Sequence, residues 1–143
     1  MIMNSQPFDV LVVDDDPSVF DLLYLIGRKE FQEATFISAV SPQDAISYLD
    51  KQLTVLPRLI LLDIDFRQEM DGFILLSLLQ ARFKRKVPIV ILSRSGKTNY
   101  VYQAYQAGAI AYTQKPDKLE GWKNYIIAMK RFWYDTSTLP PLA

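Results

Sequence analysis

Three short apolar segments each end at a polar residue, and this pattern restricts the possible folds more than any other feature of the sequence. They cover residues 8–13, 59–62 and 89–92, and the residues that follow them are Asp14, Asp63 and Ser93. Short runs rich in Val, Ile and Leu are typical of strands buried on both faces, as in parallel sheets. Weaker strand patterns cover residues 34–38 and 109–114.

Helical patterns lie between and after these strands. They cover residues 17–27, 42–52, 72–83, 98–107 and 118–134. Asp16 and Ser41 each precede a proline, which is typical of an N-cap followed by the first helical position. Gly108 is suited to end the fourth helix. Five strand–helix alternations with right-handed crossovers predict an α/β domain, a parallel sheet with helices on both faces.

The residue types that are absent limit the chemistry. The chain of 143 residues has no histidine and no cysteine. The commonest general base and the commonest transition-metal ligand are therefore missing, and thiol chemistry and disulfides are excluded. Any chemistry must depend on carboxylates, lysine, hydroxyl groups and a cation that prefers oxygen ligands.

Charge and hydropathy indicate where such a chain acts. Its formal net charge is zero, which does not favour nucleic acid or an anionic membrane as a partner. No apolar run approaches the roughly 20 residues of a membrane helix. Residues 1–8 lack the basic and then apolar order of a signal peptide. We therefore expect a cytoplasmic protein without direct nucleic-acid or membrane contact.

Carboxylates and a lysine follow the predicted strands. Ligands of such sheets bind beyond the carboxyl ends of the strands, where Asp14–Asp16, Asp63, Ser93 and Lys115 would meet. Crowded carboxylates repel one another unless a cation intervenes, and Mg²⁺ suits because it needs few protein ligands. A carboxylate can attack phosphorus to form an aspartyl phosphate, while Mg²⁺, an ammonium group and a hydroxyl offset the charge of the phosphoryl oxygens.

Four segments resemble, in order, the motifs of bacterial response-regulator receiver domains. They are residues 12–17 (VVDDDP), residues 61–65 (LLDID) continued by 70–73 (MDGF), residues 91–93 (ILS) and residues 112–116 (YTQKP). The resemblance covers residues 8–134. It implies a three-layer flavodoxin-like (βα)5 fold with strand order 2-1-3-4-5, preceded by an extension over residues 1–7 and followed by a tail over residues 135–143.

The resemblance also implies a role for each matching residue. Asp63 would accept the phosphoryl group from a partner histidine kinase, and Lys115 and Ser93 would contact that group. Asp63 and Asp15 would bind Mg²⁺ directly, Asp14 would act through water, and Asp65 would supply its backbone carbonyl. Ser93 would reposition on phosphorylation and Tyr112 would turn inward with it. Pro116 would follow a cis peptide bond.

Two departures from the family pattern concern the surroundings of Asp63. The loop over residues 65–72 is one residue longer than usual and lacks the usual proline, which leaves the placement of Arg67 open. Arg94 replaces the small residue that usually follows Ser93. We expect the Arg94 side chain to narrow access to Asp63 and so to slow phosphoryl entry and hydrolysis. Asp16 is expected to cap a helix rather than to bind metal.

Other functions fit the sequence less well. A receiver-fold interaction module that is no longer phosphorylated is the chief alternative, because the loop and Arg94 are unusual. An aspartate-dependent phosphohydrolase is a remote one, since Arg67 stands where that class has Thr or Val. Residues 95–98 (SGKT) resemble the end of a nucleotide-binding loop, but Ile91 occupies its first glycine position. We expect a strand–helix loop there, capped by Thr98.

Three consecutive aromatic residues, Phe132–Tyr134, close the last helix. They cannot all face one side of a helix, so at least one is expected to be exposed. Residues 131–140 are also similar to the end of the small phytochrome-associated response regulators of cyanobacteria, which form dimers. This similarity implies a homodimer through the last helix and tail, with a phytochrome-type sensor among the candidate kinases. We expect no output domain after the tail, so the protein would act on a downstream protein by contact.

Overall fold

The structure is a computed structural model that describes residues 7–52, 56–65 and 71–141. Strands and helices alternate along these residues. The elements are β1 (Phe8–Val13), α1 (Pro17–Glu30), β2 (Ala34–Ala39), α2 (Pro42–Lys51), β3 (Leu59–Leu62), α3 (Gly72–Phe83), β4 (Ile89–Ser93), α4 (Thr98–Gln106), β5 (Ala111–Gln114), α5 (Leu119–Met129) and the π-helical η1 (Lys130–Thr136). In the described part of the chain, no helix is long and apolar enough to cross a membrane.

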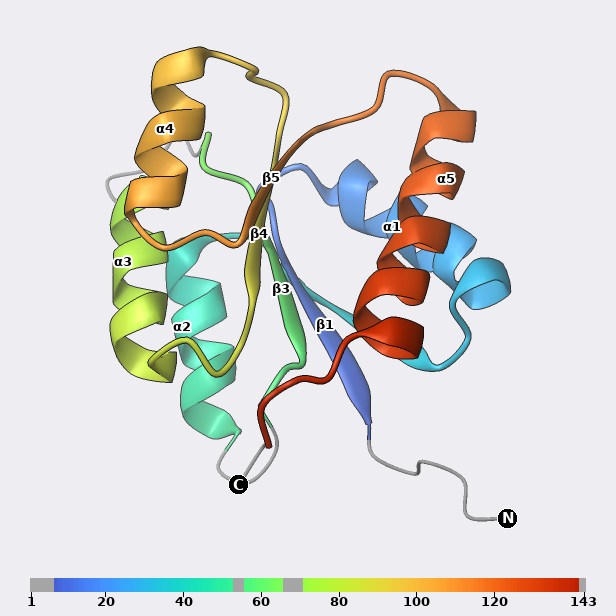
Figure 1. Cartoon of the computed structure of the whole chain (residues 1–143), viewed down its shortest axis with the longest axis horizontal. Helices are drawn as coiled ribbons and strands as arrows, with labels where there is room; N and C mark the ends of the chain where they lie inside the picture. The colour runs from blue at the N-terminus through green and yellow to red at the C-terminus, as the bar shows by residue number, and fades with distance from the viewer. Residues whose placement is uncertain (1–6, 53–55, 66–70, 142–143) are drawn as a thin grey trace.

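The strands form one parallel sheet in the order β2-β1-β3-β4-β5. Helices α2, α3 and α4 cover one face of this sheet, and α1 and α5 cover the other (Figure 1). This three-layer arrangement confirms the predicted flavodoxin-like (βα)5 fold. Because all strands run in the same direction, their carboxyl ends lie along one edge of the sheet.

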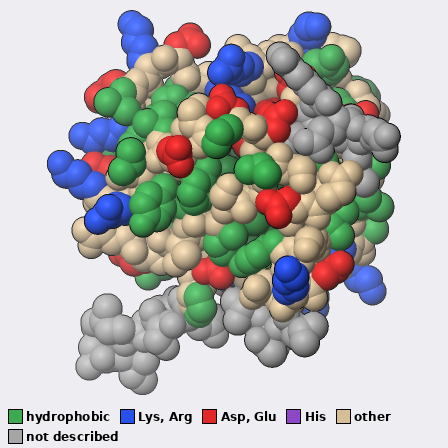
Figure 2. Space-filling view, turned by 180° about the vertical axis from the view of Figure 1, so that it is seen from behind, with side chains coloured by type: hydrophobic (Ala, Val, Ile, Leu, Met, Phe, Trp, Pro, Cys, Tyr) green, Lys and Arg blue, Asp and Glu red, His purple; other side chains and the backbone are tan. Residues whose placement is uncertain are grey.

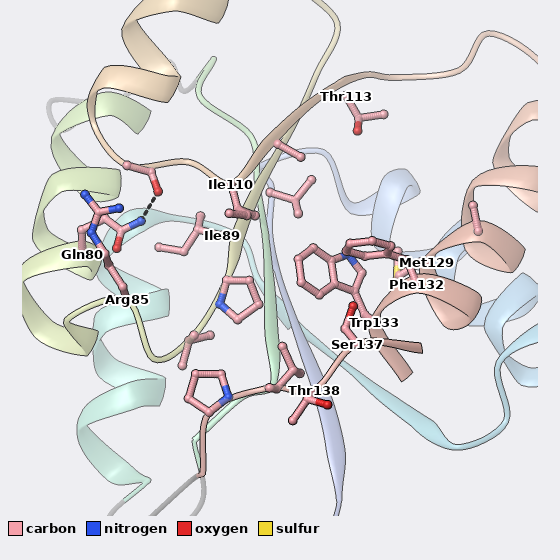
Figure 3. A pocket seen from close by; sticks show the side chains of 18 of the residues that line it. Gln80, Arg85, Ile89, Ile110, Thr113, Met129, Phe132, Trp133, Ser137 and Thr138 are labelled. Atoms are coloured by element: carbon pink, nitrogen blue, oxygen red, sulfur yellow. Dashed lines mark hydrogen bonds between the residues drawn. The ribbon is translucent and has the colours of Figure 1, made fainter. Parts of the chain in front are cut away.

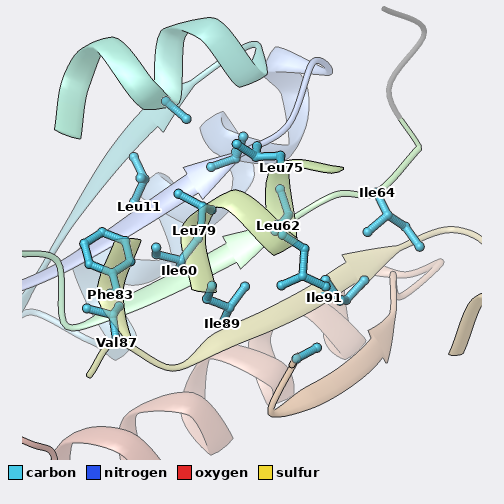
Figure 4. Close-up of a cluster of buried hydrophobic side chains, with 14 of the residues drawn as sticks. Leu11, Ile60, Leu62, Ile64, Leu75, Leu79, Phe83, Val87, Ile89 and Ile91 are labelled. Atoms are coloured by element: carbon cyan, nitrogen blue, oxygen red, sulfur yellow. The ribbon is translucent and has the colours of Figure 1, made fainter. Parts of the chain in front are cut away.

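Both faces of the sheet are packed into hydrophobic cores. Leu11 and Val13 of β1 face the core under α2–α4 (Figure 4), whereas Val10 and Val12 face the core under α1 and α5. Successive side chains of a strand point to opposite faces, so a strand between two cores needs an apolar residue at every position. The uninterrupted apolar runs of β1, β3 and β4 follow from this double burial.

Side chains cap the starts of three helices. Asp16 accepts from the N–H of Ser18 (3.0 Å), which confirms its predicted role as the cap of α1. Ser41 caps α2 in the same way, and Asp71 caps α3. The prediction that Thr98 caps α4 is wrong. Thr98 is already helical, and the side chain of Ser95 instead accepts from the N–H of Lys97 (3.2 Å).

Two glycines near helix ends have different roles. Gly108 has a φ of 104° and follows α4, as predicted. Helix α1, in contrast, continues past Gly27 to Glu30. A Cβ atom at Gly27 would lie 2.4 Å from a ring carbon of Phe36, so this glycine lets the ring of β2 pack against the helix.

The last helix continues as η1 to Thr136, and its aromatic residues have different surroundings. The ring of Tyr134 packs against Phe8 (5.4 Å between centroids) and Phe31 (5.7 Å). Phe132 is 55% exposed, which confirms the prediction of an exposed aromatic residue. Beyond η1, the carbonyl of Pro140 accepts from the guanidinium of Arg58 (2.9 Å). The boundaries of the domain at residues 8 and 134 remain a prediction.

Candidate functional site

The predicted site residues lie together at the carboxyl edge of the sheet. Backbone hydrogen bonds continue beyond the strands here and fix the register of the residues that follow them. The N–H of Asp63 donates to the carbonyl of Val13 (2.9 Å), and the N–H of Lys115 donates to the carbonyl of Ser93 (2.7 Å). The ends of β1, β3, β4 and β5 are thereby held side by side, which brings Asp14, Asp63, Ser93 and Lys115 together.

Lys115 forms the electrostatic centre of the site. Its Nζ lies 2.8 Å from Oδ2 of Asp14 and 3.3 Å from Oδ2 of Asp63, and all three side chains are buried. Burial on its own would lower the pKa of Lys115, but the carboxylates of Asp14 and Asp63 outweigh it and raise that pKa. Burial raises the pKa of Asp14, although the hydrogen bond from Lys115 opposes this shift. The ammonium group is therefore charged at neutral pH.

Three carboxylates form a group that fits a metal ion. Asp14, Asp15 and Asp63 each offer an oxygen, and these oxygens all lie within 4.8 Å of one another. Lys115 supplies one positive charge against three carboxylates, so the group retains an excess of negative charge that a divalent cation would offset. An all-oxygen donor set suits Mg²⁺ or Mn²⁺. Asp65 lies beside this group, because its N–H donates to Oδ1 of Asp63 (3.0 Å).

Ser93 and Tyr112 are connected through the loop that follows β4. The Ser93 side chain is fully buried, and its Oγ accepts from the N–H of Ser95 (3.3 Å). The Tyr112 hydroxyl donates to the carbonyl of Ser95 (2.6 Å), while the Tyr112 N–H donates to the hydroxyl of Tyr105 on α4 (3.1 Å). Burial raises the pKa of Tyr112, so its hydroxyl stays protonated and able to donate.

Arg94 lies at the mouth of the acidic site, opposite Asp16. A cavity of about 270 Å³ is lined by Asp15, Asp16, Asp63, Asp65, Arg94 and Lys115. The Arg94 guanidinium lies 3.6 Å from Oδ2 of Asp16 across the opening. Acidic and basic side chains are close together near the upper edge of the molecule in Figure 2. Hydrogen bonds from Ser18, together with the weaker effects of Lys115 and Arg94, lower the pKa of Asp16.

One residue of this region was not predicted from the sequence. Gln114 donates from Nε2 to the carbonyl of Arg94 (3.1 Å), although the two residues are 20 positions apart. Its position two residues after Tyr112 could have indicated this contact, because residues two apart on a strand have side chains on the same face. Arg67 lies outside the described residues.

The predicted cis peptide bond before Pro116 is wrong, because the described residues contain no cis peptide bond. The trans form of a bond before proline is intrinsically favoured by about 0.5–1 kcal/mol, a difference so small that surrounding structure decides the isomer. The motif by itself therefore did not determine this geometry.

Comparison with known proteins shows the family to which the chain belongs. A family model described as "Response regulator receiver domain" matches residues 10–126. An uncharacterised 14.6 kDa protein of Leptolyngbya boryana is 33% identical over 114 residues, which cover 78% of this chain and 82% of that protein. A protein-glutamate methylesterase/protein-glutamine glutaminase of Anaeromyxobacter dehalogenans is 32% identical over 110 residues. The match covers 76% of this chain but only 29% of that relative's length.

Solved structures with the same fold include two response regulators. The phosphorylated cyanobacterial phytochrome response regulator RcpA superposes with a TM-score of 0.85 at 21% identity, covering 95% of this chain and 100% of RcpA. The Mn²⁺-bound form of response regulator Rcp1 gives a TM-score of 0.82 at 24% identity, covering 94% and 100% of the two chains. At these identities the likeness shows the fold alone.

Proposed function

Since the chain belongs to the family of response regulator receiver domains, we propose that it is a single-domain response regulator whose Asp63 accepts a phosphoryl group from a histidine kinase. Receiver domains of this type are generally phosphorylated on an aspartate in the presence of Mg²⁺.

The observation that carries this proposal is the position of Lys115 between two buried carboxylates. Its Nζ contacts Asp14 and Asp63 at 2.8 and 3.3 Å, so a fixed positive charge lies where a phosphoryl group on Asp63 would place its oxygens. Catalysis of phosphoryl transfer consists mainly of positioning and charge neutralisation, and this site provides both. No histidine is needed on the accepting side.

The proposed reaction needs few participants. An Oδ atom of Asp63 attacks the phosphorus of a phosphohistidine on the kinase and forms an O–P bond, while the N–P bond breaks and its electron pair stays on the imidazole. In the later hydrolysis, the oxygen of a water molecule attacks phosphorus, the Asp63 O–P bond breaks with its electron pair left on the carboxylate, and a proton of the water is released to solvent. This step yields inorganic phosphate and restores the Asp63 carboxylate.

We assign the cation to the carboxylate group. Asp15 and Asp63 would hold Mg²⁺ directly, Asp14 would act through water, and the Asp65 carbonyl would complete the set. Bound there, Mg²⁺ supplies positive charge for the phosphoryl oxygens. The mutual distances of up to 4.8 Å between the carboxylate oxygens support this assignment.

The conformational change that follows phosphorylation of Asp63 would be transmitted through Ser93 and Tyr112. A phosphoryl oxygen on Asp63 would attract the Ser93 hydroxyl, and Ser93 already accepts from the N–H of Ser95. Tyr112 holds the carbonyl of the same Ser95 residue, so a movement of this loop would reach β5 and α4. Arg94 would slow both the entry of the phosphoryl group and its hydrolysis, because its side chain lies across the mouth of the site.

Acetyl phosphate and Mg²⁺ provide a direct test without a kinase. We expect intact-mass spectrometry to show a single phosphoryl group on the wild-type protein and none on Asp63→Asn. Asp21→Asn, an exposed change on α1, is the matched control and should be phosphorylated normally. Addition of EDTA should abolish the mass increase.

The two alternatives give different results. If the wild-type protein never gains the phosphoryl group, the result indicates an interaction module that is not phosphorylated. Continuous release of phosphate from unrelated esters, dependent on Asp65, indicates the phosphohydrolase. Phosphorylation that persists in Asp63→Asn would show that the acceptor has been assigned to the wrong residue.

We further propose that two copies pair through the last helix and the tail. An apolar cavity of about 740 Å³ lies between the edge of the sheet, η1 and residues 137–140 (Figure 3). Ile110 and Phe132 border it and are 56% and 55% exposed, which supports a protein contact at this surface. The protein would act in the cytoplasm, and a phytochrome-type sensor is the first candidate kinase to test, because RcpA is a phytochrome response regulator.

A further inference from the structure

Residues of β5 hold the loop that follows β4 by its backbone. The carbonyl of Arg94 accepts from Nε2 of Gln114 (3.1 Å), and the next carbonyl, of Ser95, accepts from the Tyr112 hydroxyl (2.6 Å). Gln114 and Tyr112 lie two positions apart on β5, so their side chains reach the loop from the same face. The path of the loop is therefore set by two side chains of the neighbouring strand.

Gly96 allows the Gln114 amide to lie directly against the loop. A Cβ atom at Gly96 would be 2.7 Å from Oε1 and 3.2 Å from Cδ of Gln114. Any larger residue at this position would displace the amide from the Arg94 carbonyl. Displacement is sterically easy, because the obstructed atom is the end of a flexible side chain rather than backbone.

The Arg94 side chain has little else to hold it in place. It is 77% exposed, and its contact with Asp16 is an ion pair of 3.6 Å at the surface. Exposed ion pairs of this kind contribute little by themselves. Oδ1 of Asp16 is already occupied by the N–H and hydroxyl of Ser18, so Oδ2 faces Arg94. The position of the Arg94 backbone consequently sets the point from which the guanidinium reaches toward Asp16.

Arg94 and Asp16 lie between two cavities. The inner cavity of about 270 Å³ contains Asp63, and an outer cavity of about 430 Å³ extends over Gln114, Pro116 and Trp122. Both cavities are lined by Asp16, Arg94 and Lys115. The position of the Arg94 side chain therefore affects both cavities.

We propose that Gln114 is a positioning residue that holds the Arg94 backbone so that the guanidinium stays near Asp16 and narrows access to Asp63. The inference rests on the proposed phosphorylation of Asp63. Through Arg94, Gln114 limits how fast a phosphodonor reaches Asp63 and how fast water reaches the phosphoryl group. Water attacks phosphorus, the Asp63 O–P bond breaks, and the products are inorganic phosphate and the free carboxylate.

The test compares rate constants of the purified protein with acetyl phosphate and Mg²⁺. In Gln114→Met the length of the side chain is kept but the donor is lost. We expect phosphorylation and hydrolysis to become faster by about three- to tenfold, the change expected from one neutral hydrogen bond. Gln43→Met, an exposed change on α2, is the matched control and should leave both rate constants unchanged.

Two further variants separate positioning from a general effect on structure. Gly96→Ala displaces the Gln114 amide without altering Gln114, so it should give the same increase even if Gln114→Met folds poorly. In the Arg94→Ala background, Gln114→Met should cause no additional increase, because the residue through which it acts is gone.

The outcomes distinguish the inference from the proposed function. A wild-type protein that is not phosphorylated overturns both. Normal phosphorylation of Asp63 with unchanged rate constants in Gln114→Met and Gly96→Ala overturns the inference alone. Rate increases that add fully to that of Arg94→Ala also overturn it, since Gln114 would then act independently of Arg94.

Discussion

At the scale of single residues, Lys115 of the candidate site also affects the stability of the fold. The structure places its ammonium between the carboxylates of Asp14 and Asp63, where all three side chains are buried. Removing one member of a buried charge cluster leaves the others without compensation, which is more costly than the loss of a surface ion pair.

We therefore expect Lys115→Met to lower the free energy of unfolding by about 3 kcal/mol in the absence of divalent cations. Added Mg²⁺ should recover part of this loss, because a cation that binds only the folded state stabilises it. Urea denaturation with and without Mg²⁺ measures both effects. Lys51→Met at the exposed end of α2 is the control, and an equal loss in the two variants would contradict this account.

Most site residues were predicted from the sequence because each follows a strand directly. Asp14, Asp63 and Ser93 interrupt or end apolar runs, and a parallel sheet brings such positions to one edge. The pairing of Gln114 with Arg94 was not predictable in this way. It joins a strand to a loop 20 positions away, and no sequence pattern specifies which side chain reaches which carbonyl.

At the scale of single elements, the beginning of α3 is built against the residues that follow Asp63. Asp71 caps the helix by accepting from the N–H of Ile74 (2.9 Å). A Cβ atom at Gly72 would lie 2.1 Å from Cα of Ile64, so the helix can approach this backbone only with glycine. The Asp-Gly pair of the phosphoacceptor motif thus sets the distance between α3 and the site.

Gly72→Ala is expected to lower the free energy of unfolding by about 1–3 kcal/mol, as overpacking against backbone does. It should also slow phosphorylation, because the segment carrying Asp65 must move. Ser77→Ala, on the exposed side of the same helix, controls for helix propensity and should not destabilise the protein. Chemical denaturation and acetyl phosphate labelling measure the two effects, and a fully stable Gly72→Ala would show that the clash is avoided.

Helix α5 carries a tyrosine whose ionisation should affect stability at alkaline pH. Burial raises the pKa of Tyr125 from 10.0 to about 12, while a hydrogen bond with Thr113 opposes the shift. The neutral hydroxyl is favoured in the folded state, so its contribution is fully present below pH 10 and is lost as the pH rises toward 12. The full loss is on the order of 2 kcal/mol.

Tyr125→Phe should therefore lose less stability than the wild type between pH 10 and about pH 12, the window bounded by these two pKa values. Urea denaturation at several pH values gives the difference. Tyr102→Phe on α4 is the control, because Tyr102 is 65% exposed and should follow the wild type. Identical pH profiles for wild type and Tyr125→Phe would contradict the prediction.

The sequence predicted best the boundaries of strands that are buried on both faces. Strands β1 and β3 begin and end as expected, because two-sided burial demands continuous apolar residues. Helix α1 was predicted too short, since Gly27 serves a contact with Phe36 that only the folded chain reveals. Strand β5 begins at Ala111 rather than at residue 109, because its flanking alanines and isoleucine carry no sharp boundary signal.

At the scale of the whole molecule, the proposed pairing of two copies can be tested directly. The proposed dimer surface combines the cavity of Figure 3 with the exposed side chains of Ile110 and Phe132. We expect sedimentation to show a dimer and Phe132→Glu to weaken it by at least tenfold, which corresponds to about 1.4 kcal/mol. Leu25→Glu on α1 is the control, because Leu25 is 62% exposed but does not line the cavity. A monomeric wild type, or a dimer unaffected by Phe132→Glu, would contradict this surface.

The hydroxyl of Tyr105 also affects how this protein can meet other molecules. Strand β5 is at the end of the sheet, and its Tyr112 N–H is already bound by that hydroxyl (3.1 Å). A foreign strand that paired with β5 would have to displace the phenol first. Unprotected edges are where folded proteins polymerise into extended sheets. Tyr105 thus makes pairing of a foreign strand with β5 less favourable at this position.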